Sequence, residues 1–454
     1  MRLRTSTRSS RSRRFGAECL EARDMLASDV AVSKSGTTLN ITGNNSANDV
    51  VIVGSETAGT YTVYGIDLDA SGENTTINRQ DRSFDSDLGG RVFTGIRSIN
   101  INMNGGNDNV ILTNVAASTG ANRLQNVTIN AGTGNDNIVV GGSLTIDTDF
   151  TGDATVGTSI EEASGTVDLK GVLTILAGTG NDSITLRGVT SDSLINALGG
   201  TGAETVAMTD IIAKVITSNM ESGAATFTGS NLTTTTGNLA IINASGRNDE
   251  VTVSLDTFDV AGTAVVNTGV GTANVAISNG IVDGSMTVSS PGIAGNDAIV
   301  SITAVDVARV LTVVTGAADD TIDILNSTAD VMTVNSGNGN DSISISLDDS
   351  AEFDEIARSL TVNSGEGDDD VTITSGVTLE GGTAFDFLSV DLGGGDDNLE
   401  ISNVAVAMNA FFSGGAGFDN FDDNGGGTND FQGTYTRILF ESFDDLTEEE
   451  PEPL

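Results

Sequence analysis

The sequence predicts an all-β protein folded as a parallel β-helix, or β-solenoid, with coils of about 21–28 residues. One Gly-rich, Asp-containing phrase recurs along the chain, apolar and polar residues alternate on both sides of it, and the chain has 56 Gly but only 3 Pro. Alternation with period two is typical of strands, and a recurring interval is typical of stacked repeats. Glycine between two strands indicates a tight turn, because it adopts positive φ without steric cost.

The repeating unit predicts strand, turn and strand. Residues 173–186 read LTILAGTGNDSITL, and residues 127–140, 332–345 and 360–373 repeat this order of residue types. Two architectures fit: one solenoid coil per unit, or a row of antiparallel hairpins in a sandwich. We favour the solenoid, because a coil of this length holds two or three short strands with their turns at about 3.3 Å per residue. The expected aliphatic core includes Ile129, Ile138, Ile175, Ile184, Val334, Ile343, Val362 and Val371.

The spacing of the turns predicts how many coils separate them. Aligned on the last acidic position, the turns fall at Asp49, Asp108, Asp136, Asp182, Glu204, Asp249, Ala273, Asp297, Asp320, Asp341, Asp369, Asp397 and Asp419. From Asp249 onward the intervals are 24, 24, 23, 21, 28, 28 and 22 residues. The intervals of 46 residues before Asp182 and 45 before Asp249 are therefore interpreted as two coils each. Degenerate turns are expected at 165–169 and 223–227. At Glu204 and Ala273 the turn lacks the usual Asp, so these two positions are expected to weaken or interrupt the series of acidic turns.

The ends of the chain differ from the repeats. Residues 1–27 are basic, with 7 arginines before residue 24, and are expected to be an export or sorting segment. The solenoid is expected over 28–440, with a less regular stretch at 55–100 that is a cap or an insertion. Residues 441–454 form a charged, Pro-containing tail that is expected to be disordered.

Part of the N-terminal segment resembles a known box. Residues 13–26 read RRFGAECLEARDML. With the basic residues before them, they resemble the LEPR box of large secreted bacterial repeat proteins, in which Arg-Arg-Phe precedes Leu-Glu-Pro-Arg-x-x-Leu. Ala22 stands where that box usually has Pro. The resemblance implies export, and hence a secreted or cell-surface protein; a basic leader without an address function is the alternative.

Charge and composition exclude several classes of function. The formal net charge of −43 disfavours nucleic acid and anionic lipid as partners and favours cations. A single cysteine, Cys19, and no histidine exclude a disulfide framework, zinc fingers and the commonest general base. Apolar runs never approach the ~20 residues of a membrane helix, so no membrane span is expected.

The turns resemble the calcium-binding nonapeptide of hemolysin-type (RTX-like) secreted proteins, Gly-Gly-x-Gly-x-Asp-x-U-x, where U is a large apolar residue. Residues 414–422, GGAGFDNFD, fit every position, and most other turns lack the first glycine. The resemblance implies calcium between stacked turns, although the family repeats in direct tandem and this chain has one turn per coil. The implied metal ligands are Asp108, Asp136, Asp182, Asp297, Asp320, Asp341, Asp369, Asp397 and Asp419. Alternatively, these residues cap turns by bonding local backbone amides.

These observations favour a structural or adhesin-like repeat protein outside the cell, with calcium ions as partners and extracellular polysaccharide or other envelope proteins as further candidates. A β-helix lyase or hydrolase is the alternative, since such enzymes need clustered carboxylates, a basic residue and usually aromatic platforms. Aromatic residues make up only 4% of the chain, and Asp386, Asp391 and Arg358 form no set apart from the periodic turn acids. We therefore expect no enzyme. A solenoid that folds independently of calcium also remains open.

Overall fold

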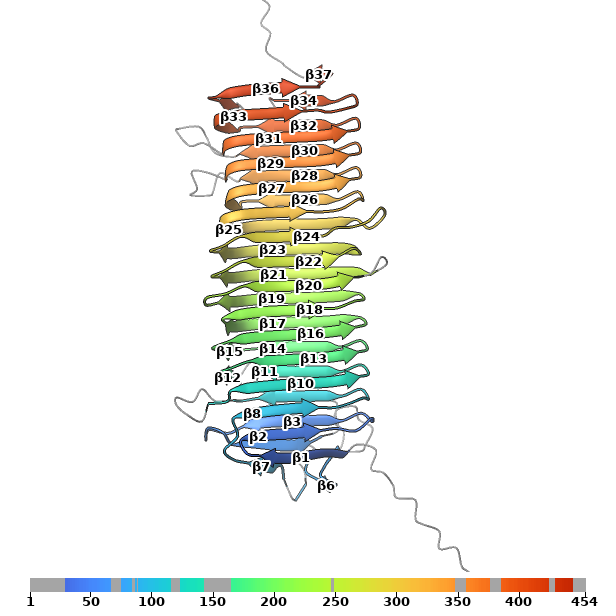
Figure 1. The fold of residues 1–454 in the computed structure, drawn as a ribbon, viewed down its shortest axis with the longest axis vertical. Helices are drawn as coiled ribbons and strands as arrows, with labels where there is room; N and C mark the ends of the chain where they lie inside the picture. The colour runs from blue at the N-terminus through green and yellow to red at the C-terminus, as the bar shows by residue number, and fades with distance from the viewer. Residues whose placement is uncertain are drawn as a thin grey trace, which may run out of the picture.

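The computed structural model is an all-β parallel solenoid, as the repeat predicts (Figure 1). It describes residues 29–66, 75–83, 86–87, 89–115, 123–142, 165–245, 249–347, 357–375, 385–423 and 429–443. Within these ranges there is no helix, and so none that could cross a membrane. The coils stack into one column, with β1 (Asp29–Ser35) near one end and β36 (Thr434–Ile438) near the other. Each coil contributes strand segments to three parallel ladders, which we call the first, second and third ladder.

The first ladder holds the strands that precede the Gly-rich turn. Each strand pairs in parallel with the equivalent strand of the next coil, as Ile129 does with Ile175. Its members are β2 (Thr38–Thr42), β8 (Ser98–Asn102), β10 (Asn126–Thr133), β13 (Leu173–Thr179), β16 (Leu194–Thr201), β18 (Val215–Met220), β20 (Leu239–Ser245), β22 (Ala264–Gly269), β24 (Met286–Ser289), the end of β25 (Ala298–Val314), β27 (Thr328–Asn338), β29 (Ala357–Glu366), β31 (Phe385–Gly394), β33 (Ala405–Ser413) and β36.

The second ladder holds the strands that follow the turn, and it is also parallel, as in the pairing of Ile138 with Ile184. Its last strand, β37, extends the ladder through Phe443, past the expected end of the solenoid at residue 440. Its members are β3 (Asp49–Gly54), β9 (Asn109–Thr113), β11 (Asn137–Gly141), β14 (Ser183–Arg187), β17 (Glu204–Ala213), β19 (Ala225–Thr234), β21 (Glu250–Val260), β23 (Thr272–Val282), the start of β25, β26 (Thr321–Leu325), β28 (Ser342–Leu347), β30 (Asp370–Ser375), β32 (Asn398–Ser402), β34 (Asn420–Asp422) and β37 (Ser442–Phe443).

The third ladder is the shortest side of the coil. It contains β12 (Val167–Leu169), β15 (Val189–Ser191) and β35 (Asp430–Phe431). Between β15 and β35 it is continued by the last residues of several second-ladder strands and then by the first residues of β27, β29, β31 and β33. The corner before it holds residues of positive φ in successive coils, such as Asn231, Thr257 and Asn279. Asparagine tolerates this left-handed conformation better than most residues, which accounts for its repetition there.

The N-terminal end differs because its strands run antiparallel. β1 pairs antiparallel with β2, and β4 (Tyr61–Gly65) pairs antiparallel with both β3 and β7 (Arg91–Phe93). β5 (Thr76–Ile77) and β6 (Gln80–Asp81) form a further antiparallel pair, and β5 also pairs with β1. The irregular stretch at 55–100 thus contains antiparallel strands next to the first coils. Residues 1–27 and 444–454 lie outside the described residues.

Alternating side chains from the three ladders fill one continuous core. All of the aliphatic residues expected to point inward are buried, with Ile129, Ile175 and Val334 fully inaccessible. Burial of each such side chain contributes about 1.5–3 kcal/mol before the entropy cost.

The coil count inferred from the long intervals is half right. Gly223 stacks directly on Gly202, and Glu204 pairs with Ala225, so the 45-residue interval does contain a hidden turn. The 46-residue interval does not, because Asn137 pairs directly with Ser183. Residues 165–169 are not a turn but lead into β12 of the third ladder. The extra length lies at 143–164, outside the described residues.

Candidate functional site

The Gly-rich turns form the corner between the first and second ladders, and glycine is required there for two reasons. Gly178 and Gly180 have φ of 110° and 141°, which side chains rarely adopt. In addition, a Cβ on Gly180 would overlap the carbonyl oxygen of Gly134 in the preceding coil, and the equivalent overlap recurs between Gly367 and Gly339. Successive turns therefore stack in close backbone contact.

One position after these glycines forms a column along the solenoid, which we call the acid column. The strand register defines it, because Asp49 pairs with Asn109 and Glu204 with Ala225. Its members are Asn48, Asp108, Asp136, Asp182, Glu204, Ala225, Val251, Ala273, Ala298, Asp320, Asp341, Asp369, Asp397, Asp419 and Glu441. The aspartates of this column are 0–2% exposed, so they point into the corner rather than to solvent.

Each column aspartate accepts a hydrogen bond from the preceding coil. Oδ1 of Asp341 accepts the backbone N–H of Asp320 at 2.8 Å, and Oδ1 of Asp369 accepts that of Asp341 at 2.9 Å. The same bond joins Asp108 to Asp136, Asp136 to Asp182, Asp369 to Asp397 and Asp397 to Asp419. In these aspartate pairs the bond joins neighbouring coils and does not cap the side chain's own turn. Local capping of the turn is present at Asn48, whose Oδ1 accepts the N–H of Asn44, and at Asp320.

An Asn or Asp stands before every column aspartate except Asp419, and it makes a second set of bonds in the opposite direction, which we call the outer Asx ladder. Oδ1 of Asn340 accepts the N–H of Asp368 at 3.0 Å, and Oδ1 of Asp368 accepts that of Asp396 at 2.8 Å. Asn107, Asn135, Asn181, Asp319 and Asp396 make the same bond to the following coil. These side chains are exposed. In these turns the column aspartate bonds the preceding coil and the residue before it bonds the following coil. The two side chains together therefore link each such turn to both of its neighbours.

The second carboxylate oxygen in the column is left over. Among the described residues, no hydrogen-bond partner is present for Oδ2 of Asp108, Asp136, Asp182, Asp341, Asp369, Asp397 and Asp419, nor for either oxygen of Glu204. Asp320 differs, since its Oδ2 accepts the N–H of Gly316 at 3.0 Å. The nearby Ser336 hydroxyl donates to the carbonyl of Ser364 at 2.9 Å. A buried, unpaired carboxylate oxygen is costly, and here the cost recurs coil after coil.

Burial changes the acidity of the column. Desolvation raises the pKa of Asp108 to about 8 and that of Asp397 to about 7, and the neighbouring carboxylates raise both further. The pKa of Glu204 rises to about 8 for the same two reasons. Burial also raises the pKa of Asp136 and Asp341, each to about 6. The accepted backbone N–H lowers the pKa of both, and the nearby Ser336 side chain lowers that of Asp341 more strongly. Packing these carboxylates without compensation thus favours their neutral form.

Most of the residues expected from the sequence occupy the column, with three errors of alignment. Asp249 stands two residues before the column, where Val251 is buried instead. Asp297 is exposed and stands one residue before the column, where Ala298 is buried instead. Asp49 is likewise one residue late, because Asn48 donates its N–H to Asp108 Oδ1 at 2.7 Å. The gap expected at Ala273 is wider, since every column residue from Ala225 to Ala298 is aliphatic.

Within the described residues, no three acidic or cysteine side chains gather where they could hold one metal ion. Among the described residues, two neighbouring coils together offer a metal ion at most two column carboxylates with unpaired oxygens. Such a pair supplies the oxygen donors that calcium prefers, but not the six to eight that it takes up.

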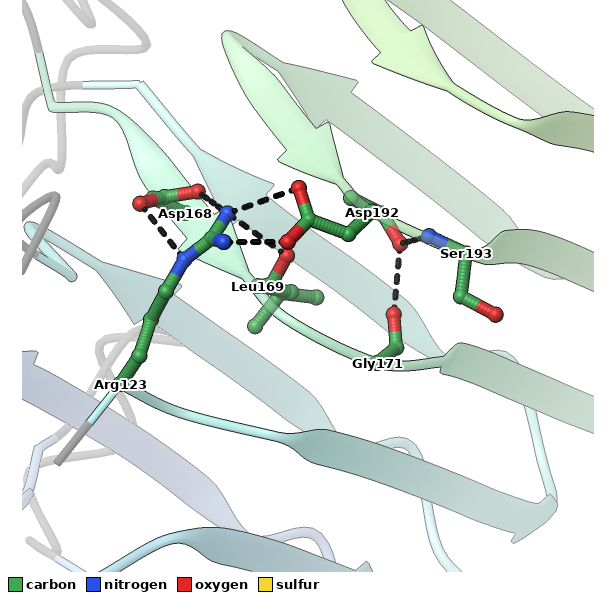
Figure 2. A network of polar contacts seen from close by, with 7 residues as sticks. Arg123, Asp168, Leu169, Gly171, Asp192 and Ser193 are labelled. Atoms are coloured by element: carbon green, nitrogen blue, oxygen red, sulfur yellow. Dashed lines mark hydrogen bonds and ion pairs between the residues drawn. The ribbon is translucent and has the colours of Figure 1, made fainter. Parts of the chain in front are cut away.

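A separate polar network was not foreseen from the sequence. The Arg123 guanidinium bonds both carboxylate oxygens of Asp168, the carboxylate of Asp192 and the carbonyl of Leu169, so it ties three coils together (Figure 2). The side chains of Arg123 and Asp168 are only 18% and 14% exposed. No spacing rule in the sequence links these residues. Arg358, considered for catalysis, instead forms an exposed pair with Asp330 at 3.2 Å.

No protein-family model matches the chain, and no curated protein and no solved structure was found to be similar to it.

Proposed function

We propose that this protein is a non-enzymatic structural solenoid of the cell surface or extracellular space, adhesin-like in its long repeat architecture, whose acid column binds calcium. The observation that carries the proposal is the series of buried carboxylate oxygens without a hydrogen-bond partner. An oxygen of this kind is stabilised by a proton or by a cation. Their repetition along one corner favours a role that the whole column shares.

The residues fit calcium in the type of donor. The ligands would be the free Oδ2 atoms of Asp108, Asp136 and Asp182 in the N-terminal coils, and of Asp341, Asp369, Asp397 and Asp419 in the C-terminal coils. Main-chain carbonyls or water would complete the six to eight oxygens. Bound calcium would supply positive charge that offsets the repulsion between stacked carboxylates.

The size of that repulsion supports a counter-ion. Coils about 4.8 Å apart place neighbouring carboxylates at a spacing that costs about 3.5 kcal/mol per pair at an effective dielectric constant of 20. The chain's net charge of −43 adds a general attraction for cations.

The test is equilibrium calcium binding to the full chain, stripped with EDTA and measured by isothermal titration calorimetry. Asp369→Asn keeps an oxygen that accepts the Asp341 N–H but removes the charge and the free Oδ2. Asp368→Asn is the matched control, because it makes the same change at the adjacent, exposed residue. We expect binding by the wild type and by Asp368→Asn, and fewer sites in Asp369→Asn. No heat of binding in the wild type would contradict the proposal.

Export rests on residues 1–27 and has its own test. The full chain is expected in the culture supernatant or envelope fraction of a bacterium that secretes proteins with this box, and a chain lacking residues 1–27 is expected to stay inside. Retention of both would contradict the proposed location without affecting the calcium test.

A further inference from the structure

The outer face of the first ladder is uncharged over most of its length. Segments from eleven coils, running from β2 to residues 331–338 of β27, contain no Asp, Glu, Lys or Arg, and all of them lie within the described ranges. We call the outward side chains of these segments the uncharged strip. In a chain with a net charge of −43, a face of this kind needs an explanation.

The other two faces do not share this property. Outward positions of the second ladder carry Arg187, Asp256 and Asp323, and those of the third ladder carry Asp259 and Asp306. The absence of charge is therefore specific to one side of the coil and does not follow from the repeat as such.

The strip mixes apolar with hydroxyl and amide groups in stacked rows. Its outward residues include Thr128, Thr174, Leu176, Leu198, Thr217, Asn219, Ile242, Val265, Asn267, Thr287, Thr312, Val314, Thr333 and Asn335. Protein–protein interfaces are likewise depleted of charge at their centre. The strip segments contain no aromatic residue, which argues against a sugar-stacking platform.

We infer that the uncharged strip is an interface between two copies of this chain, packed face to face. Any other face would bring two acidic surfaces together, which like-charge repulsion opposes. Eleven rows about 4.8 Å apart and five residues wide at about 3.3 Å make a patch of roughly 800 Å². That is about the area that each partner contributes to a stable interface of standard size.

Charges at the borders of the strip favour one orientation. On the side where the strands begin, charges of both signs are exposed: Lys170, Lys214 and Arg309, and also Asp192, Asp283 and Asp330. On the turn side, beyond the strand ends, exposed Asp297 and Asp319 are acidic. A two-fold axis parallel to the solenoid axis reverses the strand direction in the second copy, so that the three cations of each copy face the acidic turn side of the other.

The test is the molar mass of the full chain by size-exclusion chromatography with light scattering, up to about 100 µM, above the micromolar Kd of a weak interface of this size. EDTA is present so that calcium bridges between copies do not contribute. We expect a dimer. Thr217→Glu places a charge at the middle of the strip in both copies and is expected to raise the Kd at least tenfold. Thr228→Glu, the same change on the second ladder, is expected to leave the dimer intact.

Circular dichroism is the control that checks whether both variants are folded. If Thr217→Glu does not fold, Asn219→Asp introduces a charge in the same strand with almost no change in volume. A wild type that is monomeric at every concentration would overturn the inference. This holds even if the monomer is retained on an uncharged polysaccharide, because the strip would then bind that ligand and not a second copy. A dimer that both strip variants leave unchanged would also overturn the inference, since it would form through another face.

Discussion

Two stretches of the same solenoid use different hydrogen-bond acceptors at the corner between the first and second ladders. In the C-terminal coils, the N–H of each column residue donates to the carboxylate of the next coil, as Asp320 does to Asp341. In the central coils the column is aliphatic, and the N–H of Ala273 donates to the backbone carbonyl of Asp297 at 3.2 Å. Glu204, at the border between the two kinds of coil, donates in this way to the carbonyl of Ala224.

The central coils show that a backbone carbonyl can replace the carboxylate as acceptor. The acid column is therefore not needed to close the corner, yet it recurs on both sides of the aliphatic stretch with one oxygen unpaired. This comparison is the strongest reason to give the carboxylates a role beyond turn formation, and the following predictions test it.

The largest effect is expected from pH, because it acts on all column carboxyls at once. Their folded pKa values are raised, so between pH 4 and 8 the folded state binds more protons than the unfolded state. The free energy of unfolding in EDTA should therefore fall as the pH rises through this window. For each group, a tenfold difference in proton affinity between the two states corresponds to about 1.4 kcal/mol. The check is the melting temperature at pH 5 and pH 8, and a higher melting temperature at pH 8 would contradict the account.

The next largest effect is expected from replacing a turn glycine, and its cost in free energy of unfolding should differ between the acidic and the aliphatic coils. Gly180→Ala combines positive φ with overlap on the Gly134 carbonyl, and should lower the free energy of unfolding by about 3 kcal/mol or more. Gly295, in the aliphatic stretch, has φ of 87° but nothing within 4 Å of a Cβ. Gly295→Ala should cost only about 1 kcal/mol. Urea unfolding measures both, and equal costs would mean that close stacking of the turns is not what selects glycine.

A smaller effect is expected when the inter-coil bond is removed alone. Asp341→Ala recreates the residue found at Ala273 and leaves the N–H of Asp320 without its acceptor, at a cost of about 1–3 kcal/mol. Asp341→Asn retains an accepting oxygen and should cost less. If the two variants unfold at the same urea concentration, the backbone of the acidic coils relaxes into the arrangement of the aliphatic coils, and the bond contributes little.

The sequence was sufficient for the architecture because period-two alternation and repeated turns are local features. Ile129 and Ile175 could be assigned to the core, and Asp136 and Asp341 to one corner, without coordinates. The stretch 143–164 could not be recognised as extra length within one coil, because it is about as long as a coil. The two opposed sets of hydrogen bonds were also missed, since they depend on the three-dimensional register between coils.

Asp297 was assigned to the wrong position for the same reason, because the register between coils cannot be read from the sequence. Aligning acids assumes that the acid is retained, whereas in the aliphatic coils the register passes through Ala273 and Ala298. The charge-free first ladder was visible in the printed sequence, but only the ladder assignment shows that its segments lie on one face.

The most direct test of the acid column is thermal melting of the full chain at neutral pH, followed by circular dichroism, in EDTA and after addition of calcium. The account predicts that calcium raises the melting temperature of the wild type and of Asp368→Asn by several degrees, and that of Asp369→Asn by less. Melting curves of the wild type that are the same with and without calcium would contradict it, and would leave the inter-coil hydrogen bonds as the sole role of the column.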